Sequence, residues 1–184
     1  PNRNGSYEDR VMAAKALPPP KALRQLLRYE PDTGKLFWLP RDDDQRWTTQ
    51  HAGKEAFTST GTTGYKRSTV LGRVYTAHRV AWAIKTGEWP TREVDHVNGQ
   101  RDDNRWANLR SATKSQNMHN SRRRTNNTSG AKGVSWDKEV GKWMAYITVQ
   151  RKRYNLGRFK NIADAAEAYR AASQKLHGDF GRLA

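Results

Sequence analysis

Apolar side chains recur at helical spacing in three stretches of the chain. Two of these stretches, residues 21–29 and 77–85, are followed by turn signals that contain Pro and Gly. The third begins after Asn161, which is expected to cap it, and ends near Gly178. Its apolar stripe consists of Ile162, Ala165, Ala166, Tyr169, Ala172 and Leu176. The pattern therefore predicts three amphipathic helices.

Shorter apolar runs predict strands in much of the remaining chain. The expected strands are residues 35–39, 64–71, 73–76, 93–97, 109–113, 133–136, 142–149 and 151–159. Residues 40–55 are charged and predict an irregular segment. Thr113 is a plausible N-cap for a short helix that continues to Asn120. Residues 93–120 are thus expected to form a strand, a long loop, a second strand and a helix.

Charge points to a polyanionic partner. The 184 residues include 34 Lys plus Arg against 18 Asp plus Glu, which gives a formal net charge of +16 and a pI near 10.4. Nucleic acid is the natural partner of such a chain, although ribosomal and architectural proteins share this bias. The absence of cysteine excludes disulfides and Cys-ligated zinc. No apolar run is long enough to span a membrane, so the cytoplasm of a bacterial or phage-infected cell is expected.

The segment 93–120 carries the strongest chemical signal. It contains Asp95-His96, the pair Asp103-Asn104, Asn108-Leu109-Arg110 and Asn117. Phosphodiester hydrolysis requires an activated water and a cation at the scissile phosphate. A neutral His suits the first task, and hard oxygen ligands from Asp and Asn suit Mg²⁺ for the second. Because adjacent residues of an ideal strand point to opposite faces, Asp95 and His96 need a local twist to serve one site.

These residues resemble the HNH endonucleases of the phage and intron homing type. The resemblance extends upstream through Gly64-Tyr65, Ala77-His78-Arg79 and Gly87-Glu88-Trp89-Pro90, and it covers roughly residues 22–120. It implies a ββα-metal fold in which Asp95 and Asn117 bind the metal and His96 is the general base. Asn108 would brace the loop and orient His96. Asn at the third motif position marks an H-N-N variant, which favours Mg²⁺ or Mn²⁺ over zinc because an amide oxygen is a hard ligand. One metal ion per active site and no small-molecule cofactor are expected.

Structural interpretations of the same residues remain open. An Asp-His pair beside an Asn-rich loop is also typical of a capping network, and a degenerate HNH domain would keep the motif without activity. His119 is two residues from Asn117 and is expected to face away from it, toward phosphate or solvent. Arg110 either touches the scissile phosphate or packs against Asp103.

The region after this motif concentrates positive charge. Residues 121–160 contain 11 Lys plus Arg against two acidic residues. Within residues 130–180, the blocks Lys132-Gly133-Val134, Gly141-Lys142-Trp143, Leu156-Gly157-Arg158-Phe159 and Ala165-Ala166-Glu167-Ala168-Tyr169 resemble the ethylene-response-factor DNA-binding domain. That resemblance implies a three-stranded antiparallel sheet backed by one helix, with the sheet entering the major groove of duplex DNA. In the plant transcription factors that carry this domain, the positions that contact bases hold other residues than in this chain. The DNA sequence that the plant proteins recognise is therefore not expected to be the target of this chain.

Alternation along the predicted strands divides their residues between an inner and an outer face. Tyr154 and Leu156 are expected to face the helix, and the outer set is suited to phosphates and base edges. The residues expected to contact DNA are Arg122, Arg123, Arg124, Lys132, Ser135, Lys142, Tyr146, Thr148, Arg153 and Asn155.

The combined prediction is an α+β chain with a ββα-metal (HNH) nuclease domain and a small three-stranded antiparallel sheet with one helix. The expected divisions are a flexible segment 1–20, a nuclease domain 21–120 with its core at about 92–120, a basic linker 121–129 and a DNA-binding domain 130–184. The expected activity is metal-dependent hydrolysis of duplex DNA, leaving 5′-phosphate and 3′-hydroxyl ends. The sequence leaves open whether one strand or both are cut and whether the chain is a monomer or a dimer. A non-catalytic regulator and an RNA-binding or ribosome-associated protein are the alternatives.

Overall fold

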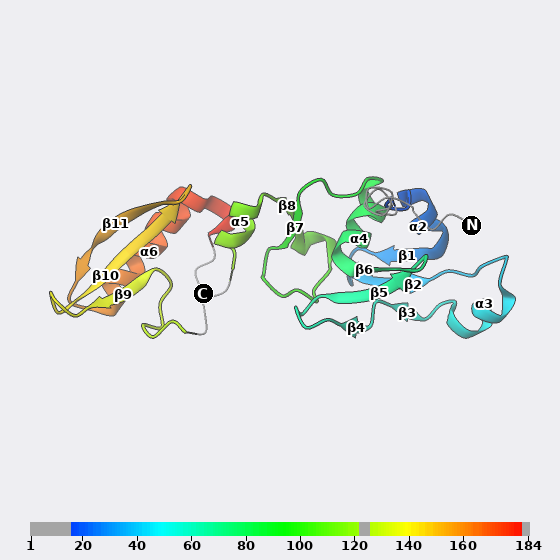
Figure 1. The fold of residues 1–184 in the computed structure, drawn as a ribbon, viewed down its shortest axis with the longest axis horizontal. Helices are drawn as coiled ribbons and strands as arrows, with labels where there is room; N and C mark the ends of the chain where they lie inside the picture. Colours follow the sequence, from blue (N-terminus) through cyan, green and yellow to red (C-terminus); the bar gives the residue numbers. More distant parts are fainter. Residues whose placement is uncertain (1–15, 122–125, 182–184) are drawn as a thin grey trace, which may run out of the picture. The chain divides into compact units, whose positions relative to one another are not determined.

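A computed structural model describes residues 16–121 and 126–181 of the chain (Figure 1). Most of the expected N-terminal segment 1–20 therefore lies outside the described residues. So do Arg122, Arg123 and Arg124 of the predicted basic linker. The chain divides into two compact units, Pro1–Trp89 and Pro90–Ala184, and each is treated by itself below.

In its described part, the first unit combines two small antiparallel sheets with helices. One sheet has the strand order β1-β2-β3 and the other β4-β5-β6. The elements are α2 (Pro20–Leu26), β1 (Leu27–Glu30), β2 (Lys35–Trp38), α3 (Gln45–His51), β3 (Glu55–Ala56), β4 (Ser59–Thr60), β5 (Lys66–Val70), β6 (Arg73–Thr76) and α4 (Ala77–Thr86). Helix α4 packs against α2, and Leu23 and Val80 are fully buried.

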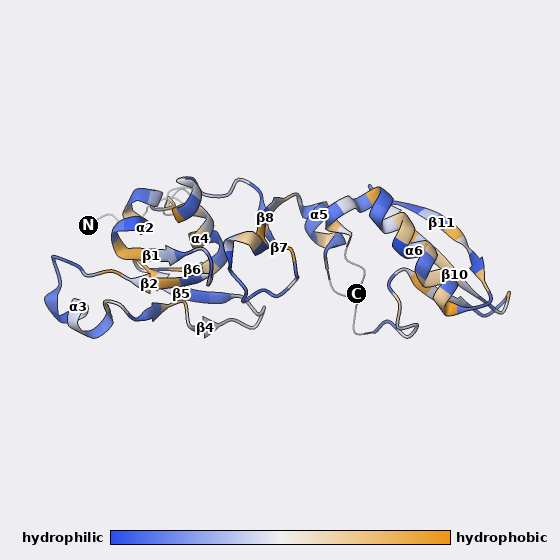
Figure 2. Cartoon of the chain, turned by 180° about the vertical axis from the view of Figure 1, so that it is seen from behind, coloured by the Kyte–Doolittle hydropathy of each residue, from blue (hydrophilic) through white to orange (hydrophobic). Residues whose placement is uncertain are grey.

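The structure corrects two sequence predictions for this unit. The helix predicted for residues 21–29 ends at Leu26, because Leu27–Glu30 pairs with Lys35–Trp38 as the hairpin β1-β2. The segment predicted to be irregular contains helix α3, whose N-cap Asp44 accepts a hydrogen bond from the Trp47 main-chain N at 2.7 Å. Most of α3 is hydrophilic (Figure 2), so its sequence has no apolar stripe that would predict a helix. The predicted strands β2, β5 and β6 and helix α4 are confirmed.

The second unit begins with the hairpin β7 (Glu93–His96) and β8 (Leu109–Ala112), joined by a loop that ends in the short 3-10 helix η1 (Trp106–Asn108). Helix α5 (Lys114–His119) follows β8 directly. Thr113 caps it as predicted: its Oγ1 accepts from the Gln116 main-chain N, and the Gln116 side chain accepts from the Thr113 main-chain N. This reciprocal pair fixes the direction in which α5 leaves the hairpin.

The C-terminal part of this unit is a three-stranded antiparallel sheet of order β11-β10-β9, packed against one long helix. Its elements are β9 (Val134–Asp137), β10 (Lys142–Val149), β11 (Lys152–Phe159), α6 (Ile162–His177) and the 3-10 helix η2 (Gly178–Phe180). The predicted three strands and helix are therefore confirmed. Val134, Ala145 and Ala165 form the buried core between sheet and helix.

Two details differ from the expectation. Asn161 occupies the N-cap position of α6, but its side chain makes no capping hydrogen bond. Its Nδ2 instead lies 3.5 Å from Asp164 Oδ2. Tyr154 pairs with the buried Ile147, yet 43% of Tyr154 is exposed. It lies near the β10-β11 turn.

Candidate active site

The β7-β8 hairpin brings the two halves of the motif together. Its register sets Asp95 opposite Arg110 and His96 opposite Leu109. Val94, Asp95 and His96 are all buried, although two of the three are polar. Buried polar groups require partners, so the contacts of Asp95 and His96 define the site.

Asp95 is held by two side chains from different elements. Arg110 Nε donates to Asp95 Oδ2 at 2.9 Å, and Arg110 Nη2 lies 2.9 Å from the same oxygen. Asn120 Nδ2 lies 3.0 Å from each carboxylate oxygen of Asp95 and 2.7 Å from the His96 main-chain oxygen. Three oxygen atoms therefore converge on one amide group, which can donate only two hydrogen bonds. Such an oxygen-rich position is also suited to a hard cation.

His96 is 3% exposed and has a different partner from Asp95. Its Nε2 lies 3.2 Å from Asn104 Oδ1, and Asn104 Nδ2 donates to the Asp102 main-chain oxygen at 3.2 Å. With the amide assigned this way, Nε2 is the protonated ring nitrogen and Nδ1 carries the lone pair. Burial lowers the pKa of His96, against the opposing effects of the Asn104 hydrogen bond and the Asp95 charge. The imidazole is thus neutral at neutral pH, as a proton acceptor must be.

Asn108 joins the two ends of the connecting loop. Its Oδ1 accepts from the Asn98 main-chain N at 2.9 Å, and its Nδ2 donates to the Asp103 main-chain oxygen at 2.7 Å. The Asp103 carboxylate accepts from Asn98 Nδ2 and from Arg105, and the Arg105 hydrogen bond lowers the pKa of Asp103 to about 2. The loop is consequently held by the ionised carboxylate of Asp103 and by the uncharged side-chain amides of Asn98 and Asn108.

The two amides at the end of α5 have different partners. Asn117 Nδ2 donates to Glu93 Oε2 at 2.5 Å, whereas the buried Asn120 is the residue that contacts Asp95. The sequence analysis assigned a role to Asn117, included Asn104 in the motif without a role, and did not propose Asn120. A spacing of three residues places Asn117 and Asn120 on one side of a helix, which was the available signal.

The chain returns to this site 69 residues after Arg110. Arg110 Nη1 donates to the Asp179 main-chain oxygen at 2.8 Å, and the guanidinium carbon lies 3.8 Å from the centre of the Phe180 ring. Arg110 therefore packs on Asp95 and the η2 segment, and not on Asp103, which is paired with Arg105. No sequence signal indicated this contact.

Of the described residues predicted to contact DNA, six lie on the strands of the C-terminal sheet and one, Lys132, lies apart from them. The register aligns Tyr146 with Asn155 and Thr148 with Arg153, and the Arg153 guanidinium lies 3.5 Å from the centre of the Tyr146 ring. These four residues share one face of the sheet. Lys142 and Ser135 belong to the neighbouring β10-β9 pair. Lys132 instead turns toward the end of α5, where its Nζ donates to the main-chain oxygens of His119 and Ser121.

The described residues lack two features, a cluster of acidic, His or Cys side chains for a metal and a membrane-spanning helix. They contain no group of three or more His, Cys, Asp or Glu side chains that could hold a metal. None of their helices is long and apolar enough to cross a membrane.

Comparison with known proteins identifies the region around the hairpin. The HNH endonuclease family matches residues 75–119, which include β7, β8 and α5. Protein 3.8 of Escherichia phage T7 is 31% identical over 107 residues, which make up 58% of this chain and 88% of that protein. This chain belongs to the family of phage protein 3.8. No solved structure matches it.

The HNH match shows that residues 75–119 of this chain form a domain of a nuclease family that acts on DNA. The matched segment contains Asp95, His96, Asn108 and Asn117, and it ends one residue before Asn120. It also ends before the C-terminal sheet, whose resemblance to the ethylene-response-factor domain remains a prediction.

Proposed function

We propose that this chain is a metal-dependent DNA endonuclease that hydrolyses phosphodiester bonds in duplex DNA. The observation that carries the proposal is the buried pair Asp95 and His96, which Asn120 contacts together, within the segment that matches the HNH endonucleases. The phage relative supports a phage-encoded enzyme, of the homing type or free-standing, acting in the cytoplasm of the infected cell.

His96 is the proposed general base. Its lowered pKa keeps the ring neutral, and the contact with Asn104 favours the tautomer in which Nδ1 accepts the proton of the attacking water. Asn104 is therefore a positioning residue for His96. Asn108 positions His96 indirectly, because its side chain is hydrogen-bonded to Asn98 and to Asp103 in the loop that carries Asn104.

Mg²⁺ or Mn²⁺ is the proposed metal, one per site. The ligand set is Asp95 with Asn120, which contacts it, and Asn117, which the family resemblance assigns. These residues fit a hard cation, because turning the Asn120 amide over would add a fourth oxygen to the three that already converge there. A cation held there supplies positive charge to the scissile phosphate and to the leaving oxygen. Arg110, which is paired with Asp95, would then also lie close to the bound cation.

The C-terminal sheet is the proposed duplex-binding domain, of the ethylene-response-factor type. On its outer face, Arg153 and Asn155 are suited to base edges and Lys142 to a phosphate. The proposed products are 5′-phosphate and 3′-hydroxyl ends. One site per chain implies a nick, and a double-strand break then requires two cleavage events.

Nicking of supercoiled plasmid tests this proposal. Purified full-length chain should relax the plasmid with Mg²⁺ or Mn²⁺ and stop when the metal is chelated. His96→Ala should lower the rate by roughly 10²–10⁴-fold, the usual contribution of a positioned base. His51→Ala is the matched control, because His51 lies in α3 of the first unit. Parental nicking by His96→Ala would remove His96 as the base.

A non-catalytic DNA-binding protein is the second candidate. One observation favours it: Asp95 is 5% exposed and one of its oxygens is paired with Arg110, as in a purely structural ion pair. Such a protein would shift plasmid in a gel at every metal concentration but would never relax it. The nicking assay therefore separates the two functions.

A further inference from the structure

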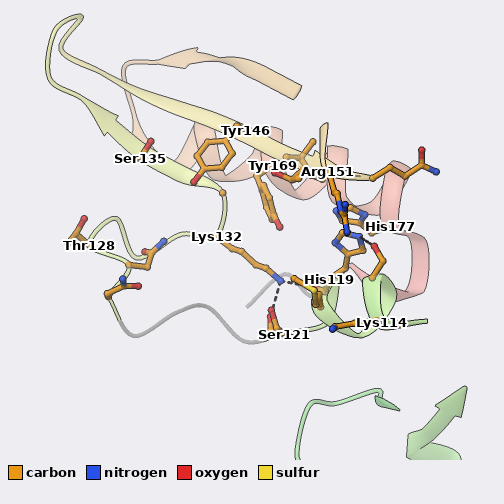
Figure 3. Close-up of a pocket in the computed structure, with 18 residues that line it drawn as sticks. Lys114, His119, Ser121, Thr128, Lys132, Ser135, Tyr146, Arg151, Tyr169 and His177 are labelled. Atoms are coloured by element: carbon orange, nitrogen blue, oxygen red, sulfur yellow. Dashed lines mark hydrogen bonds between the residues drawn. The ribbon is translucent and has the colours of Figure 1, made fainter. Parts of the chain in front are cut away.

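A basic cavity of about 1050 Å³ opens in the second unit, beside α5, the segment before β9, β10 and the end of α6 (Figure 3). Its cations are Lys114, Lys132 and Arg151, and none of the eighteen lining residues is Asp or Glu. The volume is at the upper end of the roughly 300–1,000 Å³ of small-molecule sites, so it exceeds the needs of a single phosphate group. A concave site whose described lining holds cations and no carboxylate favours an extended anion.

Lys132 is fixed in this cavity by neutral acceptors. Its Nζ donates to the main-chain oxygens of His119 at 2.7 Å and Ser121 at 2.9 Å, and Figure 3 shows the side chain extended toward α5. Both acceptors are main-chain oxygens at the end of α5, so these hydrogen bonds hold the ammonium group in place beside that helix. The positive charge is therefore fixed before any ligand arrives.

Arg151 reaches the cavity from a strained turn. Gln150 and Arg151 join β10 to β11 with φ values of 49° and 66°, a left-handed conformation that is unfavourable for residues other than glycine. Glycine or asparagine would relieve the strain, as is usual in two-residue hairpins. Two long polar side chains occupy these unfavourable positions, and both line the cavity, which favours a role for them in ligand binding.

The remaining wall offers ring surfaces and a segment of β10 that lies beyond its pairing with β9. His119 and His177 stack with ring centres 3.7 Å apart, and Tyr146 and Tyr169 line the same cavity. Strand β9 pairs only with Lys142–Ala145, so the second half of β10 borders the cavity instead of a third strand. Ring faces next to fixed cations are typical of sites for a nucleic-acid strand.

We propose that this cavity binds the sugar-phosphate backbone of the substrate DNA. The proposal rests on the proposed endonuclease function for the identity of the ligand. It assigns phosphate contacts to Lys114 on α5, to Arg151 at the β10-β11 turn and to Lys132 in the same cavity. The outward residues Lys142 and Arg153, which the sequence pattern favours, do not line the cavity.

A charge-matched pair of double variants tests this site in the full chain. Lys114→Ala with Arg151→Ala removes two exposed cavity cations, and Lys138→Ala with Lys175→Ala removes two exposed cations of the same unit outside the cavity. Affinity is measured by fluorescence anisotropy with a labelled 20-base-pair duplex in EDTA, over a range of salt concentrations. We expect the cavity variant to lose on the order of tenfold in affinity and about two phosphate contacts, roughly 1.8 in the logarithmic salt slope, and the control to stay near the parent.

The possible outcomes separate the site from the enzyme. Equal losses in both double variants, or no binding by the parent, overturn the cavity site even if the parent nicks plasmid. A selective loss in the cavity variant supports the site even if the parent proves unable to cut, because binding is measured without metal. A deoxynucleotide monophosphate added as competitor should not displace the duplex at sub-millimolar concentration. Displacement would make this a nucleotide site and refute the strand proposal.

Discussion

Gly133 is the position at which a single methyl group should do the most damage to the C-terminal sheet. A Cβ built on Gly133 would lie 2.1 Å from Tyr169 Cδ2 and 2.6 Å from the Tyr146 main-chain oxygen. The ring would have to retreat by about 1.3 Å to reach the ordinary contact distance of 3.4 Å, and the backbone oxygen belongs to a paired strand. Gly141, with nearly the same φ of 66° against 69°, has no atom within 4 Å of its added Cβ.

This pair separates steric overlap from backbone strain. A left-handed alanine costs roughly 1–2 kcal/mol, and the stiffer unfolded chain returns about 0.4–1 kcal/mol of that. Gly141→Ala should therefore lower the free energy of unfolding by no more than about 1.5 kcal/mol. Overpacking adds about 1–3 kcal/mol at Gly133, so Gly133→Ala should cost roughly 1–4.5 kcal/mol in total, and about 1–3 kcal/mol more than Gly141→Ala.

Urea unfolding of the two variants and the parent, followed by tryptophan fluorescence and circular dichroism, measures the difference. Trp136 and Trp143 report on the sheet in question, since they lie in β9 and β10. If the two variants unfold within about 0.5 kcal/mol of each other, the tight approach of Tyr169 to the backbone is not what requires glycine.

Three further predictions concern the hairpin and its helix. Burial lowers the pKa of His96, so the nicking rate should fall only as pH drops through a value below the ordinary 6.5; an inflection above 6.5 in the rate against pH would contradict this. Asn120→Ala should raise the Mg²⁺ concentration for half-maximal nicking more than Asn117→Ala, because Asn120 contacts Asp95 and Asn117 contacts Glu93; equal titration curves would count against Asn120 as a ligand. Thr113→Ala should lower the free energy of urea unfolding by about 1 kcal/mol through loss of the cap, whereas Thr113→Ser should not.

Local sequence was a sufficient guide where an element stabilises itself or repeats a simple pattern. The cap at Thr113, the strands of the β7-β8 hairpin and the sheet with helix α6 were predictable because spacing, capping and alternation act over a few residues. Helix α3 escaped prediction because it has no apolar face. The early end of α2 at Leu26 escaped prediction because strand pairing with β2 outweighed helical spacing.

The sequence by itself determined which residues could do chemistry: Asp95, His96, Asn108 and Asn117 stand in a motif with the residue types that hydrolysis needs. Tertiary structure alone decided their partners. It set Asn120 rather than Asn117 on Asp95, because that contact depends on the direction in which α5 leaves the hairpin. It also brought Asp179 and Phe180 onto Arg110 and assembled a basic cavity from α5, β10 and α6. Such contacts join positions tens of residues apart, and they follow from the packing of whole elements, which no local spacing records.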